Sequence, residues 1–326
     1  MKDVSIIIVG FGNIGQGLAK TLLAKKSYLK KHAGTGLRVV AVCEKKGCVV
    51  DEKGVDLKKL LEGRLRWGRH KTLDVIRDVA ADVVVELTPG DIQTGQPGLS
   101  HINAALDSKK HVVTSNKSPI ALEYKKLTEK AGAKGLKLLF EASVAGAIPV
   151  INTLSRELKA NTCSNIYGIL NGTTNFILSK MSEEGLDYET ALKEAKTLGF
   201  AESDPSYDVE GVDSALKLVI LANSLLGESI SYADVSVEGI LDVTPECIEL
   251  AIKHGYTVKL VADVREKKVS PRLVPIGHPL DVSDNLNAIL AQTDLSGEIT
   301  LVGEGAGPVQ TSSAIMTDLI EISNNL

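Results

Sequence analysis

The stretch VSIIIVGFGNIG, residues 4–15, decides the fold expected for this chain. An apolar, mostly β-branched run leads into three glycines with the spacing GxGxxG, and a helical pattern begins at about Ile14. In this setting Gly10 allows a tight turn, Gly12 lets a pyrophosphate approach the backbone, and Gly15 lets the helix pack on the strand. An ordinary glycine turn is the alternative, but the surrounding strand and helix patterns favour a nucleotide site at the helix start. The predicted cofactor-binding residues are Gly10, Phe11, Gly12, Asn13, Ile14 and Gly15.

The rest of the first third alternates apolar runs with helical patterns. Continuous apolar strands separated by helices indicate a parallel sheet that is buried on both faces. We therefore expect an α/β fold with a Rossmann-type doubly wound parallel sheet. Besides residues 4–10, the expected strands are residues 37–44, 81–89, 110–116 and 136–143.

From Pro149 onward the pattern changes to that of an α+β substrate and dimerisation domain. Residues 299–322 again read as a strand, a glycine-rich turn and a helix, and we expect this helix to pack against the first domain. The predicted dinucleotide-binding domain is residues 1–133, completed by helix 308–326, and the second domain is residues 134–307. Its expected elements are helices 148–160, 173–184, 188–198 and 209–226, a strand at 165–172, and a proline-broken hairpin over 256–276.

Length and composition exclude several classes of protein. The 326 residues suffice for two hydrophobic cores, since single cores rarely exceed about 250–300 residues. Hydrophobic residues make up 44% and charged residues 24% of the chain, which is ordinary for a globular protein. The net charge of −4 and the lack of a basic face in the sequence argue against nucleic-acid binding.

The four cysteines, Cys43, Cys48, Cys163 and Cys247, show neither CxxC spacing nor a partner histidine pattern. A zinc finger and a secreted disulfide framework are therefore not expected, and we interpret the cysteines as buried, reduced thiols. The apolar run at the start is too short for a signal peptide or a membrane span. These features predict a cytoplasmic protein that does not bind membranes.

A single lysine, Lys217, stands in an otherwise aliphatic helical pattern. Asp213 precedes it by four residues, which places both side chains on one face of a helix. Helical spacing adds Glu210 to the same narrow polar stripe. Because a surface helix usually exposes about half of its circumference, this helix should be largely enclosed, with its polar stripe facing a cleft or an edge. A solvent-facing ion pair is the alternative interpretation.

Three polar clusters follow strands or begin helices: TSNKSP at 114–119, EASVAGAIP at 141–149 and LNGTTN at 170–175. In open α/β sheets, ligands bind outside the carboxyl ends of the strands. Lys117 is therefore expected to project toward a bound nicotinamide, and an ordinary loop lysine is the alternative.

The acidic residue expected at the end of the second strand is Glu44, in AVCEKKG. An acid at this place favours the free ribose hydroxyl of NAD, whereas Lys45 and Lys46 could neutralise the 2′-phosphate of NADP. The alternative to the NADP interpretation is that Lys45 and Lys46 are ordinary exposed loop lysines. The choice between NAD and NADP stays open, and the pattern leans toward an enzyme that accepts both.

Together these clusters resemble the homoserine dehydrogenase family. The match runs from the first glycines through TSNKSP, EASVAGAIP, LNGTTN and LGFAESDPSYDVEGVDSALKL to the final GEGAG, and so covers nearly the whole chain. The resemblance implies an NAD(P)-dependent enzyme, typically a homodimer, that interconverts aspartate 4-semialdehyde and homoserine in threonine and methionine biosynthesis.

The resemblance also implies roles for individual residues. Lys217 matches the acid–base lysine, and Lys117 matches a second active-site lysine. Asp213 and Glu202 match groups that contact the substrate amino group or hold Lys217. Asp208, Gly172 and Thr173 match further substrate-binding positions, and Thr88, Ser115 and Gly305 match further cofactor-binding positions.

A monovalent-cation site is implied in the same way. Glu141 and the backbone carbonyls of Val144, Gly146 and Ile148 match the family's ligands, and hard oxygen donors suit a hard cation such as Na⁺. A helix-capping or surface carboxylate is the alternative for Glu141.

Two departures from the family pattern stand out. Many members carry SDS where this chain has Cys43-Glu44-Lys45, which again leaves the cofactor preference open. Many members also continue into a regulatory ACT module, which is not seen before Leu326, so feedback control by threonine through such a module is not expected.

Two other functions compete with this interpretation. A phosphorylating semialdehyde dehydrogenase needs a nucleophilic cysteine with a nearby base, and Cys163, expected in a short loop, is the candidate nearest to the right domain. A protein that senses NAD(P) without chemistry needs neither Lys117 nor the Asp213–Lys217 pair. By contrast, a cation that can donate a proton beside the aldehyde oxygen lowers the barrier to reduction as hydride arrives, and a lysine can fill this role.

Overall fold

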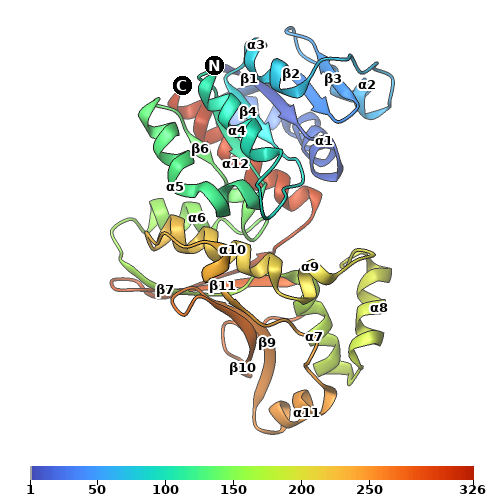
Figure 1. Cartoon of the computed structure of the whole chain (residues 1–326), viewed down its shortest axis with the longest axis vertical. Helices are drawn as coiled ribbons and strands as arrows, with labels where there is room; N and C mark the ends of the chain where they lie inside the picture. Colours follow the sequence, from blue (N-terminus) through green and yellow to red (C-terminus); the bar gives the residue numbers. More distant parts are fainter. Residues whose placement is uncertain (1) are drawn as a thin grey trace. The chain divides into compact units, whose positions relative to one another are not determined.

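The computed structural model describes residues 2–326, which form two compact units (Figure 1). The first unit comprises residues up to 143 together with 307–326, and the second comprises residues 144–306. The first unit extends past the expected boundary at residue 133 because the short strand β6 (Leu138–Leu139) pairs with β5 (His111–Thr114). Only these two residues of the expected strand 136–143 are extended, and Glu141–Ser143 form a helical turn, η2.

The first unit is an α/β fold built on a six-stranded sheet with the order β3-β2-β1-β4-β5-β6. All neighbouring strands are parallel except β2 and β3. The strands not yet given are β1 (Lys2–Val9), β2 (Thr35–Glu44), β3 (Gly47–Val50) and β4 (Val83–Glu86). The helices are α1 (Asn13–Tyr28), the π-helical turn η1 (Leu29–Ala33), α2 (Leu57–Leu61), α3 (Thr72–Asp78), α4 (Gly98–Asp107), α5 (Lys117–Ala133) and α12 (Pro308–Asn325).

Strand β3 was not expected from the sequence, and it departs from a purely parallel sheet. Only Lys45 and Lys46 connect it to β2, and a connection of two residues allows an antiparallel hairpin but no crossover. The hairpin returns through Gly47, whose φ of +133° lies outside the range that side chains favour.

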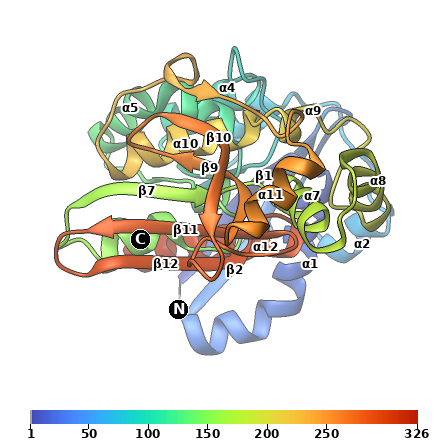
Figure 2. The ribbon, with the colours of Figure 1, turned by 90° about the horizontal axis from the view of Figure 1, so that it is seen from below.

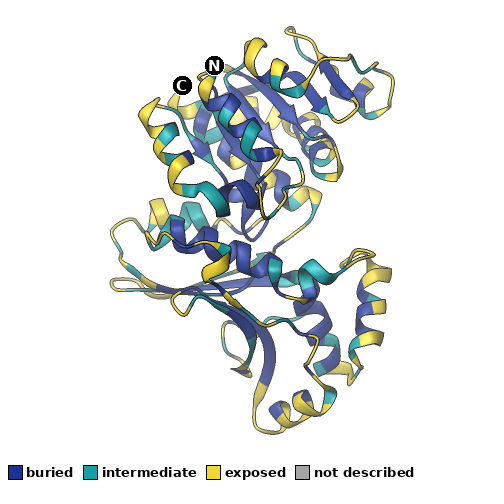
Figure 3. Ribbon diagram, in the orientation of Figure 1, coloured by how far each residue is buried: buried dark blue, intermediate teal, exposed yellow. Residues whose placement is uncertain are grey.

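The core of the first unit lies on both faces of this sheet. Helices α1 and α12 pack against each other on one face, and α4 packs against β4 and β5 on the other (Figure 1). β1 is buried from Val4 to Val9 and β4 along its whole length (Figure 3), which explains why residues 4–9 read as a largely apolar run. Leu319 of α12 is part of the same cluster as Leu18 of α1 and Ile6 of β1.

The second unit contains a mostly antiparallel six-stranded sheet with the order β12-β11-β7-β9-β10-β8 (Figure 2). Helices α7 and α10 pack against its strands. The strands are β7 (Cys163–Ile169), β8 (Ser236–Val237), β9 (Tyr256–Asp263), β10 (Lys268–Pro275), β11 (Leu286–Thr293) and β12 (Gly297–Glu304). The helices are α6 (Val150–Asn152), the π-helical turn η3 (Thr153–Glu157), α7 (Gly172–Glu184), α8 (Tyr188–Leu198), α9 (Ser206–Val209), α10 (Val212–Leu225), the turn η4 (Tyr232–Asp234) and α11 (Pro245–Lys253).

Three expected elements of the second unit are wrong in detail. The single helix 209–226 is two helices, α9 and α10, because Gly211 between them has a φ of +84°. Glu210 therefore lies outside α10 and is exposed, so it does not belong to the polar stripe of Lys217. The helix 148–160 is only α6 followed by η3. The hairpin 256–276 is not broken at Pro271, since only the start of β10 pairs with β8 and an edge position needs no amide donor.

The cysteines do not all fit the expected buried class. Cys43 and Cys48 are buried and face each other across the β2–β3 ladder. Cys163 is half-buried at the start of β7 and so does not lie in a loop, and Cys247 is exposed on α11. Across residues 2–326, none of the helices combines the length and apolarity that a membrane crossing requires.

The burial of α12 makes a testable prediction. Leu319→Ala should lower the free energy of unfolding by about 2–5 kcal/mol, because Leu319 is fully buried in the first unit's core. The fluorescence of Trp67, the chain's single tryptophan, monitors urea unfolding of this unit. The control is Val309→Ala on the same helix, where the side chain is 69% exposed and a change within about 0.5 kcal/mol is expected. Equal losses in both variants would contradict this packing.

Candidate active site

The glycine turn after β1 has the geometry of a phosphate-binding loop. Gly10 has a φ of +98°, and a Cβ there would lie 2.8 Å from the carbonyl carbon and oxygen of Leu87. A Cβ on Gly15 would clash with the carbonyl oxygen of Gly10, so helix and turn are in close contact. At Gly12, by contrast, a Cβ would meet no atom of the described residues within 4 Å. Helix α1 begins at Asn13 without a side-chain cap, so its first amides are available to a phosphate.

Glu44 at the end of β2 is tied to this turn. Its Oε2 accepts a hydrogen bond from the backbone N–H of Phe11 at 3.0 Å, and its Oε1 accepts one from Lys45 N–H at 3.0 Å. The ammonium of Lys46 lies 4.5 Å from the ring centroid of Trp67. Lys45 and Lys46 are both exposed, and Lys46 also makes this cation–π contact.

The ends of β4 and β5 carry the remaining residues expected near the cofactor in this unit. Thr88 is two residues beyond the end of β4, and Ser115 follows β5 and donates its N–H to the carbonyl of Glu86 at 3.3 Å. Lys117 is half-buried and is the first residue of α5, whose cap is Asn116.

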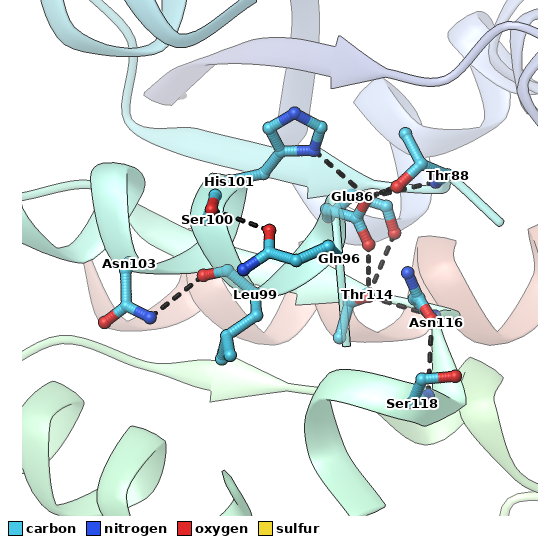
Figure 4. A network of polar contacts seen from close by, with 10 residues as sticks. All are labelled: Glu86, Thr88, Gln96, Leu99, Ser100, His101, Asn103, Thr114, Asn116 and Ser118. Carbon is cyan, nitrogen blue, oxygen red and sulfur yellow. Dashed lines mark hydrogen bonds and ion pairs between the residues drawn. The ribbon is translucent and has the colours of Figure 1, made fainter. Parts of the chain in front are cut away.

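A buried polar network joins these two strand ends (Figure 4). At its centre is Glu86, which is fully buried and accepts hydrogen bonds from the N–H and the hydroxyl of Thr88. His101 of α4 and Thr114 of β5 also contact its carboxyl oxygens. Glu86 and His101 were not expected from the sequence, although a lone acid at the end of the apolar run VVVE indicates a buried carboxyl group at a strand end.

In the second unit, Lys217 of α10 is buried, with 7% of its surface exposed. Its Nζ lies 2.7 Å from Oδ2 of Asp213 and donates a hydrogen bond of 2.6 Å to the carbonyl oxygen of Leu170. The alternative of a solvent-facing ion pair is therefore wrong. The carbonyl of Leu170 was also missed by sequence reasoning, because a backbone acceptor leaves no mark on the side-chain pattern.

The polar cluster around Lys217 includes Asp208, Asn171 and Thr173. Asn171 donates from Nδ2 to Asp208 at 2.7 Å and to Asp213 at 3.0 Å, and Thr173 donates from its hydroxyl to Asp208 at 3.2 Å. Burial raises the pKa of the Asp208 carboxyl above its usual value, and the nearby charge of Asp213 raises it further. Asn171 also caps α7, a role that LNGTTN could have revealed.

Two other expected substrate residues lie differently. Gly172 begins α7. A Cβ there would lie 2.7 Å from the carbonyl oxygen of Asn285, so a larger residue would displace the backbone at one of these two positions. Glu202 is exposed, and its side chain has no hydrogen bond or ion pair within residues 2–326. The structure therefore brings Asp213 and Asp208 to Lys217 but does not bring Glu202 there.

The expected cation ligands are divided between the two units. Glu141 belongs to the first unit, is 2% exposed, and donates its N–H to Asp318 at 3.1 Å. The alternative of a surface carboxylate is thus wrong for Glu141. The second unit contains the other expected ligands, Val144, Gly146 and Ile148, and also Gly305, whose carbonyl carbon would lie 2.5 Å from a Cβ on Gly146.

Two family models match this chain. A model described as the NAD-binding domain of homoserine dehydrogenase matches residues 10–141, and a model described as homoserine dehydrogenase matches residues 149–320. The homoserine dehydrogenase of Methanocaldococcus jannaschii is 50% identical to this chain, over 99% of each. The NAD(+)-dependent homoserine dehydrogenase of Pseudomonas canavaninivorans is 35% identical, over 99% of this chain and 97% of its own.

Solved structures agree with this assignment. A putative homoserine dehydrogenase from Archaeoglobus fulgidus is 44% identical and superposes with a TM-score of 0.92, over 98% of this chain and 99% of its own. A hyperthermophilic archaeal homoserine dehydrogenase in complex with NADPH is 30% identical, with a TM-score of 0.85 over 100% of this chain and 99% of its own. Because the family models match most of the residues and these relatives span the whole length, this chain belongs to the homoserine dehydrogenase family.

Proposed function

We propose that this homoserine dehydrogenase interconverts L-homoserine and L-aspartate 4-semialdehyde with NAD or NADP, and that Lys217 transfers the proton of the substrate oxygen. The observation that carries this role is the burial of Lys217 between Asp213 and the carbonyl of Leu170. Removing an ammonium group from water is costly, so a buried lysine held by two acceptors indicates a specific use.

The geometry at Lys217 suits proton transfer. An ammonium group has three N–H donors, and Asp213 and Leu170 take two of them, which leaves one for a substrate oxygen. During aldehyde reduction, negative charge grows on that oxygen as hydride reaches the carbon. The free N–H stabilises this charge and then gives its proton to the oxygen, and the neutral amine takes the proton back in the reverse direction.

Asp208 is the best candidate to bind the substrate's amino group. The residue is half-buried, and its carboxyl group is oriented by Asn171 and Thr173. No salt bridge to Asp208 occurs in the part of the chain that is described, and burial raises its pKa. A bound ammonium group would add a positive charge beside Asp208 and favour the ionised carboxylate.

The first unit fits the dinucleotide. The open space at Gly12 and the uncapped start of α1 provide the place for a pyrophosphate. When bound, the nicotinamide supplies or accepts the hydride. We assign Thr88, Ser115 and Lys117 to its binding, since they follow the carboxyl ends of β4 and β5.

Three further parts of the proposal remain predictions. A homodimer and a Na⁺ ion bound by Glu141 with the carbonyls of Val144, Gly146 and Ile148 rest on the family resemblance. Glu202 likewise remains a predicted substrate contact, although its side chain lies outside the Lys217 cluster.

The alternative chemistry through Cys163 is not supported. Burial raises the pKa of this thiol, whereas a nucleophilic cysteine needs a lowered one. A non-catalytic NAD(P) sensor is also disfavoured, because it gives no reason to bury the Lys217–Asp213 pair.

Lys217→Ala should lower kcat for homoserine oxidation by about 10²–10⁴-fold, the range for a positioned acid or base. Lys217→Arg should be nearly as inactive, because a guanidinium keeps its proton near neutral pH. Coenzyme affinity should hardly change in either variant. Both are measured by absorbance at 340 nm, with coenzyme titration alongside.

Lys180→Ala is the matched control for this experiment. It removes an ion-paired lysine of α7, which contacts Glu184 and Glu194, and should leave kcat intact. A folded Lys217→Ala enzyme with near-normal kcat would overturn the role and make Lys117 the first candidate.

Gly12→Val should abolish tight coenzyme binding while the protein stays folded. The φ of −75° at Gly12 accepts a side chain, and the added atoms would occupy the space predicted for the pyrophosphate. Binding is followed by NADH fluorescence. Gly132→Val on α5 also adds a side chain with no neighbour within 4 Å of its Cβ, and should bind NADH normally. Unchanged affinity in Gly12→Val would place the site elsewhere.

Glu44→Gln should shift the coenzyme preference toward NADP. The Glu44 carboxylate accepts hydrogen bonds but would repel a 2′-phosphate, and a single charge contact near the surface is worth about 1 kcal/mol. The ratio of Kd for NADP to Kd for NAD should therefore fall about fivefold. Exposed Glu52→Gln should leave this ratio unchanged. An unaltered ratio in Glu44→Gln would show that this side chain does not select the coenzyme.

A further inference from the structure

Glu86 is a fully buried acid for which the proposed reaction gives no role. It ends β4, and its backbone lies between Val9 of β1 and Thr114 of β5 in the sheet. Strand β1 leads into the glycine turn, and β5 leads into the turn that contains Ser115 and Lys117. Glu86 thus stands where the two coenzyme-binding segments of the first unit diverge.

The first arm of the network fixes the segment after β4. Oε1 of Glu86 accepts the N–H of Thr88 at 3.0 Å and also accepts its hydroxyl. This segment supports the glycine turn, because a Cβ on Gly10 would lie 2.8 Å from the carbonyl oxygen of Leu87 and 3.1 Å from the nitrogen of Thr88. A displacement of Thr88 would therefore displace the turn expected to hold the pyrophosphate.

The second arm fixes the segment after β5 (Figure 4). The Thr114 hydroxyl lies 3.0 Å from the carbonyl oxygen of Glu86 and 3.2 Å from its Oε2, and it accepts the N–H of Asn116 at 3.0 Å. Asn116 in turn caps α5 through the N–H of Ser118. The start of α5, where Lys117 lies, is thus connected to the same carboxyl group.

The carboxyl group of Glu86 fits beside α4 because residue 98 is a glycine. A Cβ on Gly98 would lie 3.1 Å from Oε2 of Glu86 and 2.5 Å from Nδ2 of Asn116. His101, 7% exposed on α4, approaches Oε1 to 3.5 Å from a third element. Among residues 2–326, no lysine or arginine forms a salt bridge with Glu86.

Such a group is expensive if it serves stability alone. Burying a carboxyl group without a fixed cation costs free energy that hydrogen bonds only partly offset, and an apolar side chain would fill the same place at lower cost. A fully connected polar network does, however, restrict the directions in which its members can lie. One arm ends at Thr88, which is assigned to coenzyme binding, and the other ends at Asn116 and Ser118, which flank Lys117.

We propose that Glu86 is a positioning residue that, through Thr88 and Thr114, holds the two coenzyme-binding segments in register, with His101 orienting its carboxyl group. This role rests on the proposed coenzyme site. Its link to the two segments consists of hydrogen bonds from Thr88 and Thr114, which are neutral donors.

The test compares Glu86→Leu with Glu86→Gln. Leucine fills the space without polar atoms, so Kd for NADH should rise at least about tenfold and kcat should fall, while KM for homoserine stays within about threefold. Glutamine can still accept from Thr88 and can donate to the Thr114 hydroxyl, so it should restore Kd to within about threefold of the parent. Kd is measured by NADH fluorescence without homoserine, at a temperature where circular dichroism shows each variant folded.

Asp263→Leu is the matched control, since Asp263 is a buried carboxylate of the second unit that bonds Asn165. It should lower the melting temperature and leave Kd for NADH unchanged. An equal rise of Kd in this control would reduce the Glu86 effect to general destabilisation and overturn the proposal. Equal losses in the leucine and glutamine variants of Glu86 would overturn it too.

If Glu86→Leu does not fold, Thr114→Val decides the question. This isosteric change removes the hydroxyl that links Glu86 to Asn116, and Kd should rise at least about threefold. An unchanged Kd in folded Thr114→Val would refute the positioning role. A parent protein that fails to bind NADH would refute the coenzyme site itself, which separates the two proposals.

Discussion

The burial of a lysine ammonium inside the second unit is the constraint on which the proposed chemistry depends. Lys217 can be buried because Asp213, one helical turn earlier on α10, and the carbonyl of Leu170 at the end of β7 accept its protons. Asp213 in turn needs Asn171, which also orients Asp208. The ends of β7, α7, α9 and α10 are thereby fixed to one another by a single buried charge.

In the first unit, buried or half-buried carboxylates hold the turns at the ends of the strands. Its strands end at one edge of a parallel sheet, where turns must be held without helical or sheet hydrogen bonds of their own. The glycine turn is fixed by close backbone contact with Leu87 and by the hydrogen bond from the N–H of Phe11 to the carboxylate of Glu44. The neighbouring turns are fixed by Glu86 from inside the sheet. Carboxylates that accept backbone or hydroxyl protons thus shape this edge.

Sequence reasoning succeeded where local pattern and local function coincide. The glycine fingerprint, the apolar run of β1 and the i,i+4 spacing of Asp213 and Lys217 are all short-range features, and the structure contains each of them. It failed where a short turn changes the path of the chain. Gly211, in a left-handed conformation, splits the expected helix and removes Glu210 from the stripe, and the two-residue turn after Glu44 produces β3.

The sequence by itself determined the fold class and the family, because periodicity and motif spacing are written along the chain. The same patterns singled out Lys217 and Lys117 as candidates. Only the tertiary structure decided which acids stand beside them. Asp213 contacts Lys217, and Asn171 joins Asp208 to Asp213, whereas Glu202, which lies closer to Asp208 in sequence than Lys217 does, stays exposed. Glu86, His101 and Thr114 lie far apart in the chain and meet because parallel strands and their crossover helices bring distant residues together. Burial and partner choice are properties of that three-dimensional packing, which no local pattern encodes.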